Sequence, residues 1–225
     1  DAVGSTLALM HALKKAGKEV VAYIDDDVPR IFSFLPGYNE KKRPPENLPA
    51  EKLPADRLVI LDANIDRVER VKQMTDAKVL NIDHHVSNHG TGDENYINPD
   101  ASSTCELIYE LFNTDRLDVS LAETIYCGII GDTGVFKYSA TSPKTLRIAA
   151  DLISYGFDFN DLIDRTFYRK TYVQNQLLGR VLMESILLMK GRVILGMVTR
   201  RTMDFYHAST SDLEGIVSQL MLTSG

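Results

Sequence analysis

The chain has 225 residues, of which 44% are hydrophobic and 25% are charged. This composition is typical of a globular protein with one large domain, or with a domain and a smaller partner. The formal net charge of -6 provides no positive field for long duplex DNA, and no run approaches the roughly 18 apolar residues of a membrane span. Since no signal-peptide pattern is present either, we expect a cytoplasmic protein that binds neither duplex DNA nor a membrane.

The first half of the chain predicts helices that alternate with strands. Ser5 is expected to cap a helix that ends at Gly17. Prolines and charged residues mark residues 36–54 as a loop. Short apolar runs bounded by turn signals predict buried strands at residues 19–24, 58–61 and 79–82.

Three further helices are predicted in the middle of the chain. Capping boxes, in which a serine precedes a glutamate by three positions, begin at Ser103 and Ser120. A third helix is expected to begin at Ser142 with a proline in its first turn and to end at Gly156. Because strands and helices follow one another through this region, we predict an α/β fold with a doubly wound, mainly parallel sheet.

The pattern changes in the last quarter of the chain. Two apolar runs flank Lys190-Gly191 and predict a hairpin, and a helix is expected from Asp212 to Met221. We therefore divide the chain into three parts. These are a first domain at residues 1–172, a connecting helix at residues 173–184 and the start of a smaller α/β domain at residues 185–225.

Acidic and imidazole side chains lie at the ends of the predicted elements. Because the carboxyl ends of parallel strands share one edge of a sheet, groups that are distant along the chain can meet there. Carboxylates brought together repel unless a cation compensates them, and oxygen and imidazole donors suit Mn²⁺, Mg²⁺, Fe²⁺ or Zn²⁺. A pair of such ions about 3.5–4 Å apart can activate water and clamp a phosphoryl group, so we expect phosphate-ester hydrolysis. The side chains are Asp62 after the second strand, Asp83-His84-His85 after the third, Asp132 at a helix break and Asp1 before the first helix.

Five ordered segments resemble the motifs of the DHH phosphoesterases. The resemblance is strongest to the DHH-DHHA1 subgroup, which includes bacterial oligoribonucleases (nanoRNases), 3′-phosphoadenosine 5′-phosphate (pAp) phosphatases and phosphodiesterases of cyclic di-AMP or pApA. It covers nearly the whole chain and implies a DHH metal-binding catalytic domain followed by a DHHA1-like substrate-binding domain. The segments are Asp1-Ala-Val-Gly-Ser, Leu61-Asp62, Asp83-His84-His85 with Ser87-Asn88, Ser102-Ser103-Thr104-Cys105-Glu106 and Gly131-Asp132-Thr133-Gly134-Val135-Phe136.

The resemblance implies a site for two manganese ions, with magnesium as an alternative metal. Asp62 would bridge the two ions, and the second ion would also need a histidine and an aspartate upstream of Asp1. The sequence contains neither these ligands nor the family's glycine-rich substrate motif. It also opens without an initiator methionine and stops after a helical pattern, so we expect residues beyond both ends. The implied metal ligands are Asp1, Asp62, His84 and Asp132.

Catalytic and substrate roles are implied in the same way. His85 would lie beside the scissile phosphate and Asp83 would support the site, which makes Asp62, Asp83 and His85 the expected catalytic residues. Hydroxyl and amide groups at the helix N-terminus near residue 103 could also bind a phosphate, although a capping role alone would explain Ser103. The expected substrate-binding residues are His85, Ser102, Ser103 and Thr104.

Together these features predict a metal-dependent phosphodiesterase or phosphatase that uses a two-metal-activated hydroxide. The expected substrates are short single-stranded RNA or small nucleotides such as pAp, pApA or cyclic di-AMP, which the sequence does not rank. A DHH-type inorganic pyrophosphatase and a nucleotide-binding sensor without activity stay as alternatives. Neither the polarity of cleavage nor the oligomeric state follows from the residues, and a homodimer is one of the open arrangements.

Overall fold

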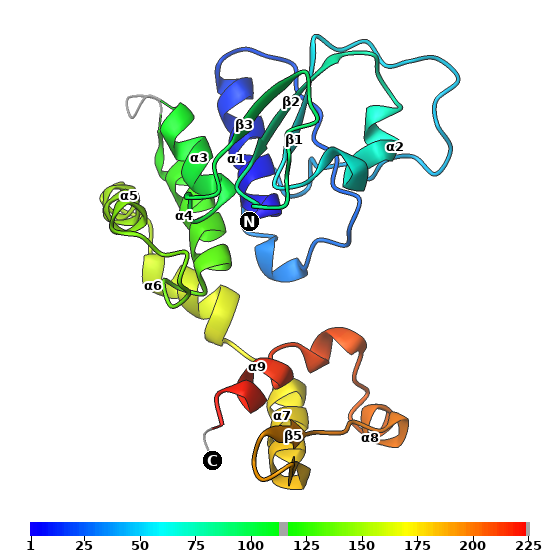
Figure 1. Ribbon diagram of the computed structural model, residues 1–225, viewed down its shortest axis with the longest axis vertical. Helices are drawn as coiled ribbons and strands as arrows, with labels where there is room; N and C mark the ends of the chain where they lie inside the picture. The colour runs from blue at the N-terminus through cyan, green and yellow to red at the C-terminus, as the bar shows by residue number, and fades with distance from the viewer. Residues whose placement is uncertain (113–116, 224–225) are drawn as a thin grey trace. The chain divides into compact units, whose positions relative to one another are not determined.

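The computed structural model describes residues 1–112 and 117–223, which form two compact units, Asp1–Phe167 and Tyr168–Gly225. The first unit contains a parallel sheet whose described strands run in the order β1 (Arg57–Leu61), β2 (Lys78–Asp83) and β3 (Glu94–Ile97) (Figure 1). Leu61 pairs with Ile82, so β1 and β2 end at the same edge. The predicted α/β class and two of the three predicted strands are confirmed.

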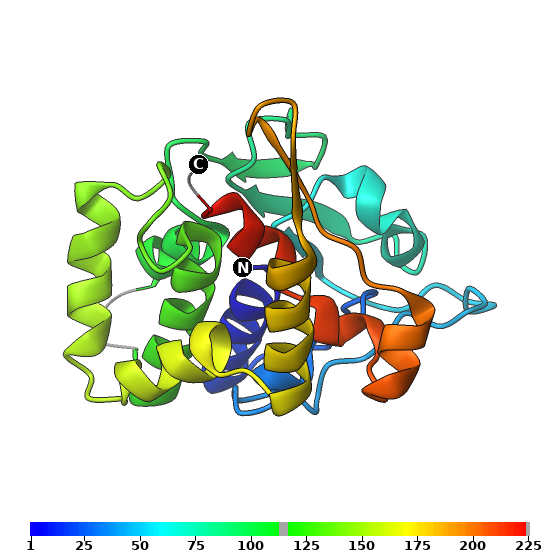
Figure 2. The same ribbon diagram turned by 90° about the horizontal axis from the view of Figure 1, so that it is seen from below.

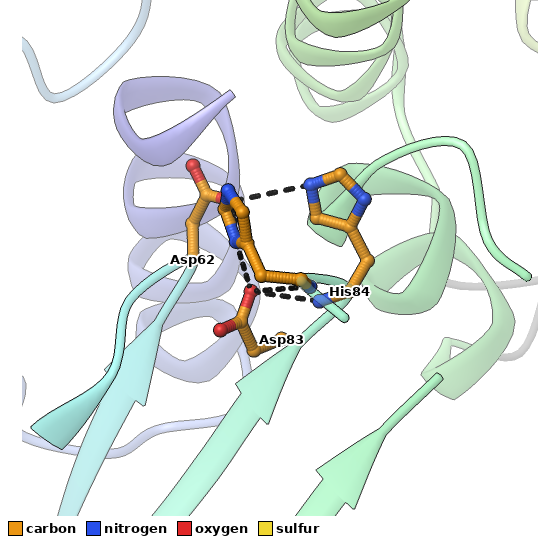
Figure 3. Close-up of side chains that lie close together, drawn as sticks. Asp62, Asp83 and His84 are labelled. Atoms are coloured by element: carbon orange, nitrogen blue, oxygen red, sulfur yellow. Dashed lines mark hydrogen bonds and ion pairs between the residues drawn. The ribbon is translucent and has the colours of Figure 1, made fainter. Parts of the chain in front are cut away.

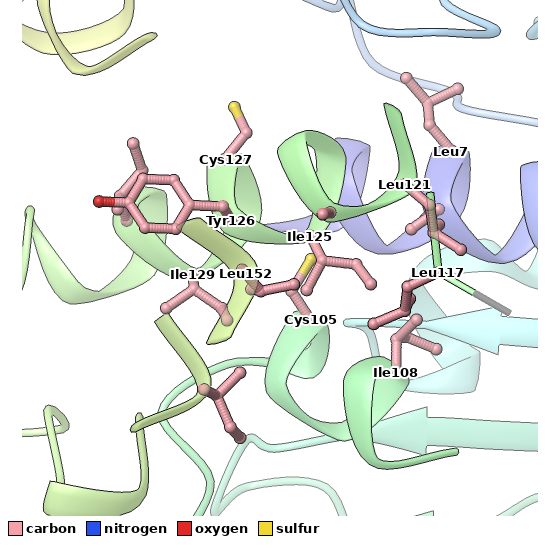
Figure 4. Packing of buried hydrophobic residues seen from close by; sticks show 14 of the residues in the cluster. Leu7, Cys105, Ile108, Leu117, Leu121, Ile125, Tyr126, Cys127, Ile129 and Leu152 are labelled. Carbon is pink, nitrogen blue, oxygen red and sulfur yellow. The ribbon is translucent and has the colours of Figure 1, made fainter. Parts of the chain in front are cut away.

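Four helices of the first unit pack together, and two of them, α1 and α3, also pack against the sheet. Figures 1 and 2 both show α1 beside α3 and α4, and Figure 4 shows side chains of these helices meeting in one apolar core. Fully buried Leu7, Ile108, Ile125 and Leu152 each come from a different helix of the four. The helices are α1 (Ala2–Lys15), α3 (Thr104–Leu111), α4 (Val119–Thr133) and α5 (Pro143–Ile153).

Two helix starts differ from the sequence prediction. Asp1 is the N-cap of α1, so Ser5 lies inside the helix, where its hydroxyl donates to the carbonyl of Asp1 at 3.1 Å. Asp118, not Ser120, caps α4 through a carboxylate that accepts a backbone N–H at 2.9 Å. Aspartate caps a helix as well as serine does, and Asp118 occupies the position at which this helix begins. The predicted caps Ser103 and Ser142 are confirmed.

Residues 19–24 do not form the predicted strand. Within the described chain they make one isolated bridge, between Tyr23 and Lys42, and Val21 is exposed. An extended segment becomes a strand only where a neighbour pairs with it along its length, and a local apolar run cannot show whether that neighbour is present. Conversely, β3 was not predicted, because its residues Glu94–Ile97 begin with two exposed polar side chains.

The long segment before β1 is largely irregular, as predicted for residues 36–54. Gly156 follows α5 in a left-handed conformation, with φ of 89°. The remaining short elements of this part of the chain are the 3-10 turns Arg30–Phe32 and Ile65–Val68, α2 (Glu69–Lys72), α6 (Phe159–Ile163) and a π-helical turn at Asp164–Tyr168.

The second unit has a small core of its own. α7 (Tyr172–Glu184) covers the predicted connecting helix and packs Leu177 and Val181 against α9 (Ile216–Met221). The predicted hairpin is present, with β4 (Ile186–Leu188) antiparallel to β5 (Val193–Leu195).

The last predicted helix of the second unit is interrupted. Gly215 takes a φ of 83° and separates a 3-10 turn at Thr210–Leu213 from α9, which is therefore shorter than predicted. α8 (Arg200–Phe205) was not predicted. None of the helices in the described ranges is both long and apolar enough to span a lipid bilayer.

Candidate metal centre

The edge where β1 and β2 end carries three of the predicted site residues. Asp62 directly follows β1 and Asp83 is the last residue of β2, with His84 next in the chain, and Figure 3 shows the three side chains gathered at this edge. Asp62 has a φ of 57°, which is uncommon for a residue other than glycine. Its N–H donates to the carbonyl of Ile82 at 3.1 Å, so the turn that aims its side chain is fixed by the neighbouring strand.

The carboxylate of Asp1 is held by the N-terminus of α3. It accepts the backbone N–H of Thr104 at 2.7 Å and that of Cys105 at 3.1 Å, and its side chain is 1% exposed. A helix N-terminus stabilises negative charge, so this buried carboxylate is compensated and oriented before any ion binds. Gly128 of α4 allows the approach, because a Cβ there would lie 2.1 Å from Cys105 Sγ and 3.3 Å from Asp1 Oδ1.

Three carboxylates converge on one nitrogen of His84. Nε2 lies 3.1 Å from Asp132 Oδ2, 3.6 Å from Asp62 Oδ1 and 3.7 Å from Asp1 Oδ2. It is buried and, within the described part of the chain, has no hydrogen-bond partner. Burial by itself lowers the pKa of His84, but the carboxylates of Asp132 and Asp62 raise it to about 10. An unpartnered nitrogen facing three carboxylates fits a bound divalent cation.

Asp132 reaches this point from a helix and not from a strand. It lies in the last turn of α4, which ends at Gly134 in a left-handed conformation. The C-terminal end of a helix carries partial negative charge, so a carboxylate there is disfavoured unless a cation offsets it. The side chain is 34% exposed, which makes it the most accessible of the four predicted ligands.

The side chain of Asp83 points inward and supports the two histidines that follow it. Oδ1 accepts the backbone N–H groups of His84 (2.7 Å) and His85 (3.2 Å), and it lies 2.7 Å from Nδ1 of the His85 ring. The Asp83 side chain is completely buried, whereas that of His85 is 48% exposed. Asp83 is therefore placed to orient His85, and His85 is accessible to a ligand.

The three hydroxyl residues predicted to bind substrate are all buried and bonded within the protein. Ser102 donates to Glu106 Oε2 at 2.6 Å, Ser103 accepts the backbone N–H of Glu106, and Thr104 donates to Asp62 Oδ1 at 3.1 Å. The structure thus shows these hydroxyls supporting the site, and a phosphate contact by them remains a prediction. Ser102 and Ser103 share the partner Glu106, which was predicted as part of a capping box and of a family motif but without a role in the site.

Six of the predicted site residues form two overlapping groups, and within each group the ligand atoms lie within 4.8 Å of one another. Both groups combine carboxylate oxygens with imidazole nitrogens, a donor set that suits Mn²⁺ and Mg²⁺ better than a thiolate metal. We call the six residues the Asp/His cluster. The groups are Asp1, His84 and Asp132, and Asp62, Asp83, His84 and His85.

Two residues behind the cluster were not predicted to have a role. Asn81 and Asn88 are buried, and they bond to each other and to Asp83. A polar residue in the middle of the apolar run of β2 was the signal that could have identified Asn81.

Comparisons with known proteins agree with the motif pattern. The model of the N-terminal domain of the DHH family matches residues 1–129. The bifunctional oligoribonuclease and PAP phosphatase NrnA of Thermus thermophilus is 38% identical over 186 residues, which cover 81% of this chain and 54% of that protein. The protein of the same name from Bacillus subtilis is 28% identical over 231 residues, covering 100% of this chain and 71% of that protein. The chain thus spans about half the length of the Thermus relative.

A solved structure shares the fold. The exopolyphosphatase-related protein of Bacteroides fragilis aligns with 100% of this chain and 69% of its own, with a TM-score of 0.88 at 23% sequence identity.

Proposed function

Because the chain belongs to the DHH family, we propose that it is a divalent-metal-dependent phosphoesterase that hydrolyses short oligoribonucleotides and small nucleotides such as pAp. The observation that carries this proposal is the meeting of three carboxylates around the unpartnered Nε2 of His84. The names of the two NrnA relatives supply the substrate class, and they favour it over inorganic pyrophosphate.

We assign Asp1, Asp62, His84 and Asp132 as metal ligands, with Mn²⁺ as the first choice of ion and Mg²⁺ as the second. A bound ion would supply Lewis acidity, which makes water more acidic and offsets negative charge on a phosphoryl group. The resemblance to the family implies two ions, and Asp62 is the residue we expect them to share.

The protein's own groups would prepare and orient the reaction. Thr104 keeps one oxygen of Asp62 in a fixed direction through its hydroxyl, and α3 does the same for Asp1 through two N–H groups. Asp83 holds Nδ1 of His85, which leaves the other ring nitrogen to contact the phosphate. Such groups accelerate hydrolysis because they are already placed where charge develops.

The test is hydrolysis of a ribodinucleotide, pAp, pApA, cyclic di-AMP and pyrophosphate by the full-length protein, with and without Mn²⁺. We expect mononucleotide release that requires the ion and is lost in Asp62→Ala and His84→Ala. His89→Ala is the matched control, since His89 is exposed and lies outside the Asp/His cluster. Cleavage of pyrophosphate alone would favour a pyrophosphatase, and nucleotide binding without hydrolysis would favour a sensor.

A further inference from the structure

Two buried asparagines lie behind the Asp/His cluster. Asn81, in the middle of β2, is 0% exposed, and Asn88, in the loop after His85, is 7% exposed. A buried amide is unfavourable unless its polar atoms are bonded, so the partners of these side chains indicate what the amides hold in place.

Asn81 is oriented by backbone carbonyls. Its Nδ2 donates to the carbonyls of Ile60 at 3.2 Å and Ala63 at 3.0 Å. Carbonyl oxygens only accept, so this end of the amide must be the NH₂ group and Oδ1 must face the other way as an acceptor. The two carbonyls stand on either side of Asp62 in the chain, and Asn81 is therefore anchored to the turn that carries that residue.

Asn88 continues the same direction of donation. Its Nδ2 lies 2.8 Å from Asn81 Oδ1 and 2.6 Å from Asp83 Oδ2, and its Oδ1 accepts the N–H of Gly90 at 3.0 Å. Turning this amide over would set its oxygen against two acceptors and its NH₂ group against a donor. Asn88 must therefore donate to Asp83.

The donation ends at the ring of His85. Asp83 accepts from Asn88 through Oδ2 and from two backbone N–H groups through Oδ1, so both of its oxygens face donors and act as acceptors. Nδ1 of His85 lies 2.7 Å from the same Oδ1, so Nδ1 must carry a hydrogen. No hydrogen bond from the described residues reaches Nε2 of this half-exposed ring, and that nitrogen keeps its lone pair when the ring is neutral.

We propose that Asn88, anchored by Asn81, is a positioning residue that fixes His85 in its Nδ1–H tautomer. This inference rests on the proposed function, in which His85 contacts the substrate phosphate. Asn88 acts by holding Asp83, because an Asp83 side chain with a free Oδ2 can rotate and lose the ring of His85. The presentation of Nε2 is then set by side chains that touch neither metal nor substrate.

The direct test is ¹⁵N NMR of the histidine rings in the metal-free protein, with His85 assigned by the signals absent from His85→Ala. We expect the Nδ1–H tautomer in the wild type and a mixture with Nε2–H in Asn88→Ala. Asn95→Ala is the matched control, because the side-chain hydrogen bonds of Asn95 to the described residues go to the backbone of Gly92 and not to the Asp/His cluster. Asn88→Asp keeps the size of the side chain and replaces the donor, and it serves if Asn88→Ala does not fold. An unchanged tautomer in a folded Asn88 variant overturns the inference.

The second test asks whether Asn88 acts through His85. In the Mn²⁺-loaded protein, Asn88→Ala should lower kcat by about 10- to 100-fold, as expected for a residue behind a functional group, and change KM by less than about 3-fold. In a His85→Ala background the same substitution should cost less than about 3-fold, because the group it positions is absent. Equal losses in both backgrounds overturn the inference. A wild type that shows the Nδ1–H tautomer, sensitive to Asn88, but hydrolyses none of the substrates would support the positioning and refute the proposed function.

Discussion

The Asp/His cluster and the β4–β5 hairpin differ in how deeply their side chains are buried and in how many partners these side chains have. In the cluster, Asp1 and Asp83 are almost completely buried, and each accepts two or more N–H bonds, Asp1 from α3 and Asp83 from the residues that follow it. In the hairpin the backbones pair, yet five of the six strand side chains are more than two-fifths exposed. These are Ile186, Leu187, Leu188, Val193 and Leu195.

The difference shows that the contribution of a side chain to stability depends on the number of its partners and not on its residue type. A buried carboxylate that loses its hydrogen-bond donors still bears the cost of desolvation. Substitution of the residues around it should therefore lower the free energy of unfolding. An exposed leucine has little contact to lose, although leucine is normally a core residue. Substitutions in the two regions should therefore differ by several kcal/mol in their effect on the free energy of unfolding.

The largest effect is expected for Glu106→Ala, behind the cluster. The Glu106 side chain is fully buried, accepts the hydroxyls of Ser102 and Thr145, and lies 3.2 Å from Lys144 Nζ. Removing the carboxylate leaves the buried hydroxyls of Ser102 and Thr145 without this acceptor, which costs about 1–3 kcal/mol for each, and we expect this loss in the free energy of unfolding measured by denaturant titration. A loss under about 1 kcal/mol would show that substitution of a buried residue behind the cluster destabilises the protein no more than substitution of a surface residue.

The same carboxylate predicts acid sensitivity. Burial by itself raises the pKa of Glu106, but hydrogen bonds from Ser102 and Thr145 and the ammonium of Lys144 lower it below the usual value of 4.5. A carboxylate whose pKa is lower in the folded than in the unfolded state adds stability above pH 4.5, and this stability is lost as the pH falls below that value. We expect Glu106→Gln to weaken the decline of unfolding free energy below pH 4.5, relative to the wild type.

An intermediate effect is expected for Thr104→Val, which removes a hydroxyl that bonds to the Asp/His cluster. Its bond to Asp62 Oδ1 is lost, whereas the backbone N–H that binds Asp1 is kept. Residues behind metal ligands typically contribute about 10- to 100-fold in affinity, so the Kd for Mn²⁺ measured by calorimetry should rise by that factor. Thr104→Ser retains the hydroxyl and should restore most of the affinity. Equal affinities of the valine variant and the wild type would refute this role.

A smaller effect is expected for Asp118→Ala, at the opposite end of α4 from Asp132. The substitution removes the N-cap, whose carboxylate also lies 2.8 Å from Lys15 Nζ. Loss of an aspartate cap costs about 1 kcal/mol of stability. Since the cap is distant along the helix from the cluster, affinity for Mn²⁺ should stay within about 2-fold of the wild type by calorimetry.

The smallest effect is expected for Leu187→Ser in the hairpin. Leu187 is 56% exposed, so the free energy of unfolding should change by less than about 0.5 kcal/mol. Leu177→Ala provides the contrast within the same unit, because Leu177 is fully buried in α7 and its truncation should cost about 2–5 kcal/mol. A large loss for Leu187→Ser would mean that the hairpin is covered in the working protein.

The amino-acid sequence by itself determined the elements whose signals are local. The apolar runs of β1 and β2, the serine caps of α3 and α5, and the ordered motifs from Asp1 to Asp132 all depend on residues a few positions apart. Apolar runs and capping residues are visible over that range, which is why the α/β class could be predicted, and parallel strands share one edge, which is why these residues were expected to gather there.

Only the tertiary structure decided which atoms meet. Thr104 bonds to Asp1 across 103 positions and to Asp62 across 42, so its hydroxyl faces a carboxylate of the cluster. The missing strand at residues 19–24 has the same cause, since pairing depends on a distant neighbour. A hydrogen bond needs its partner within about 3 Å, and that proximity is set by packing between segments, which no local pattern records.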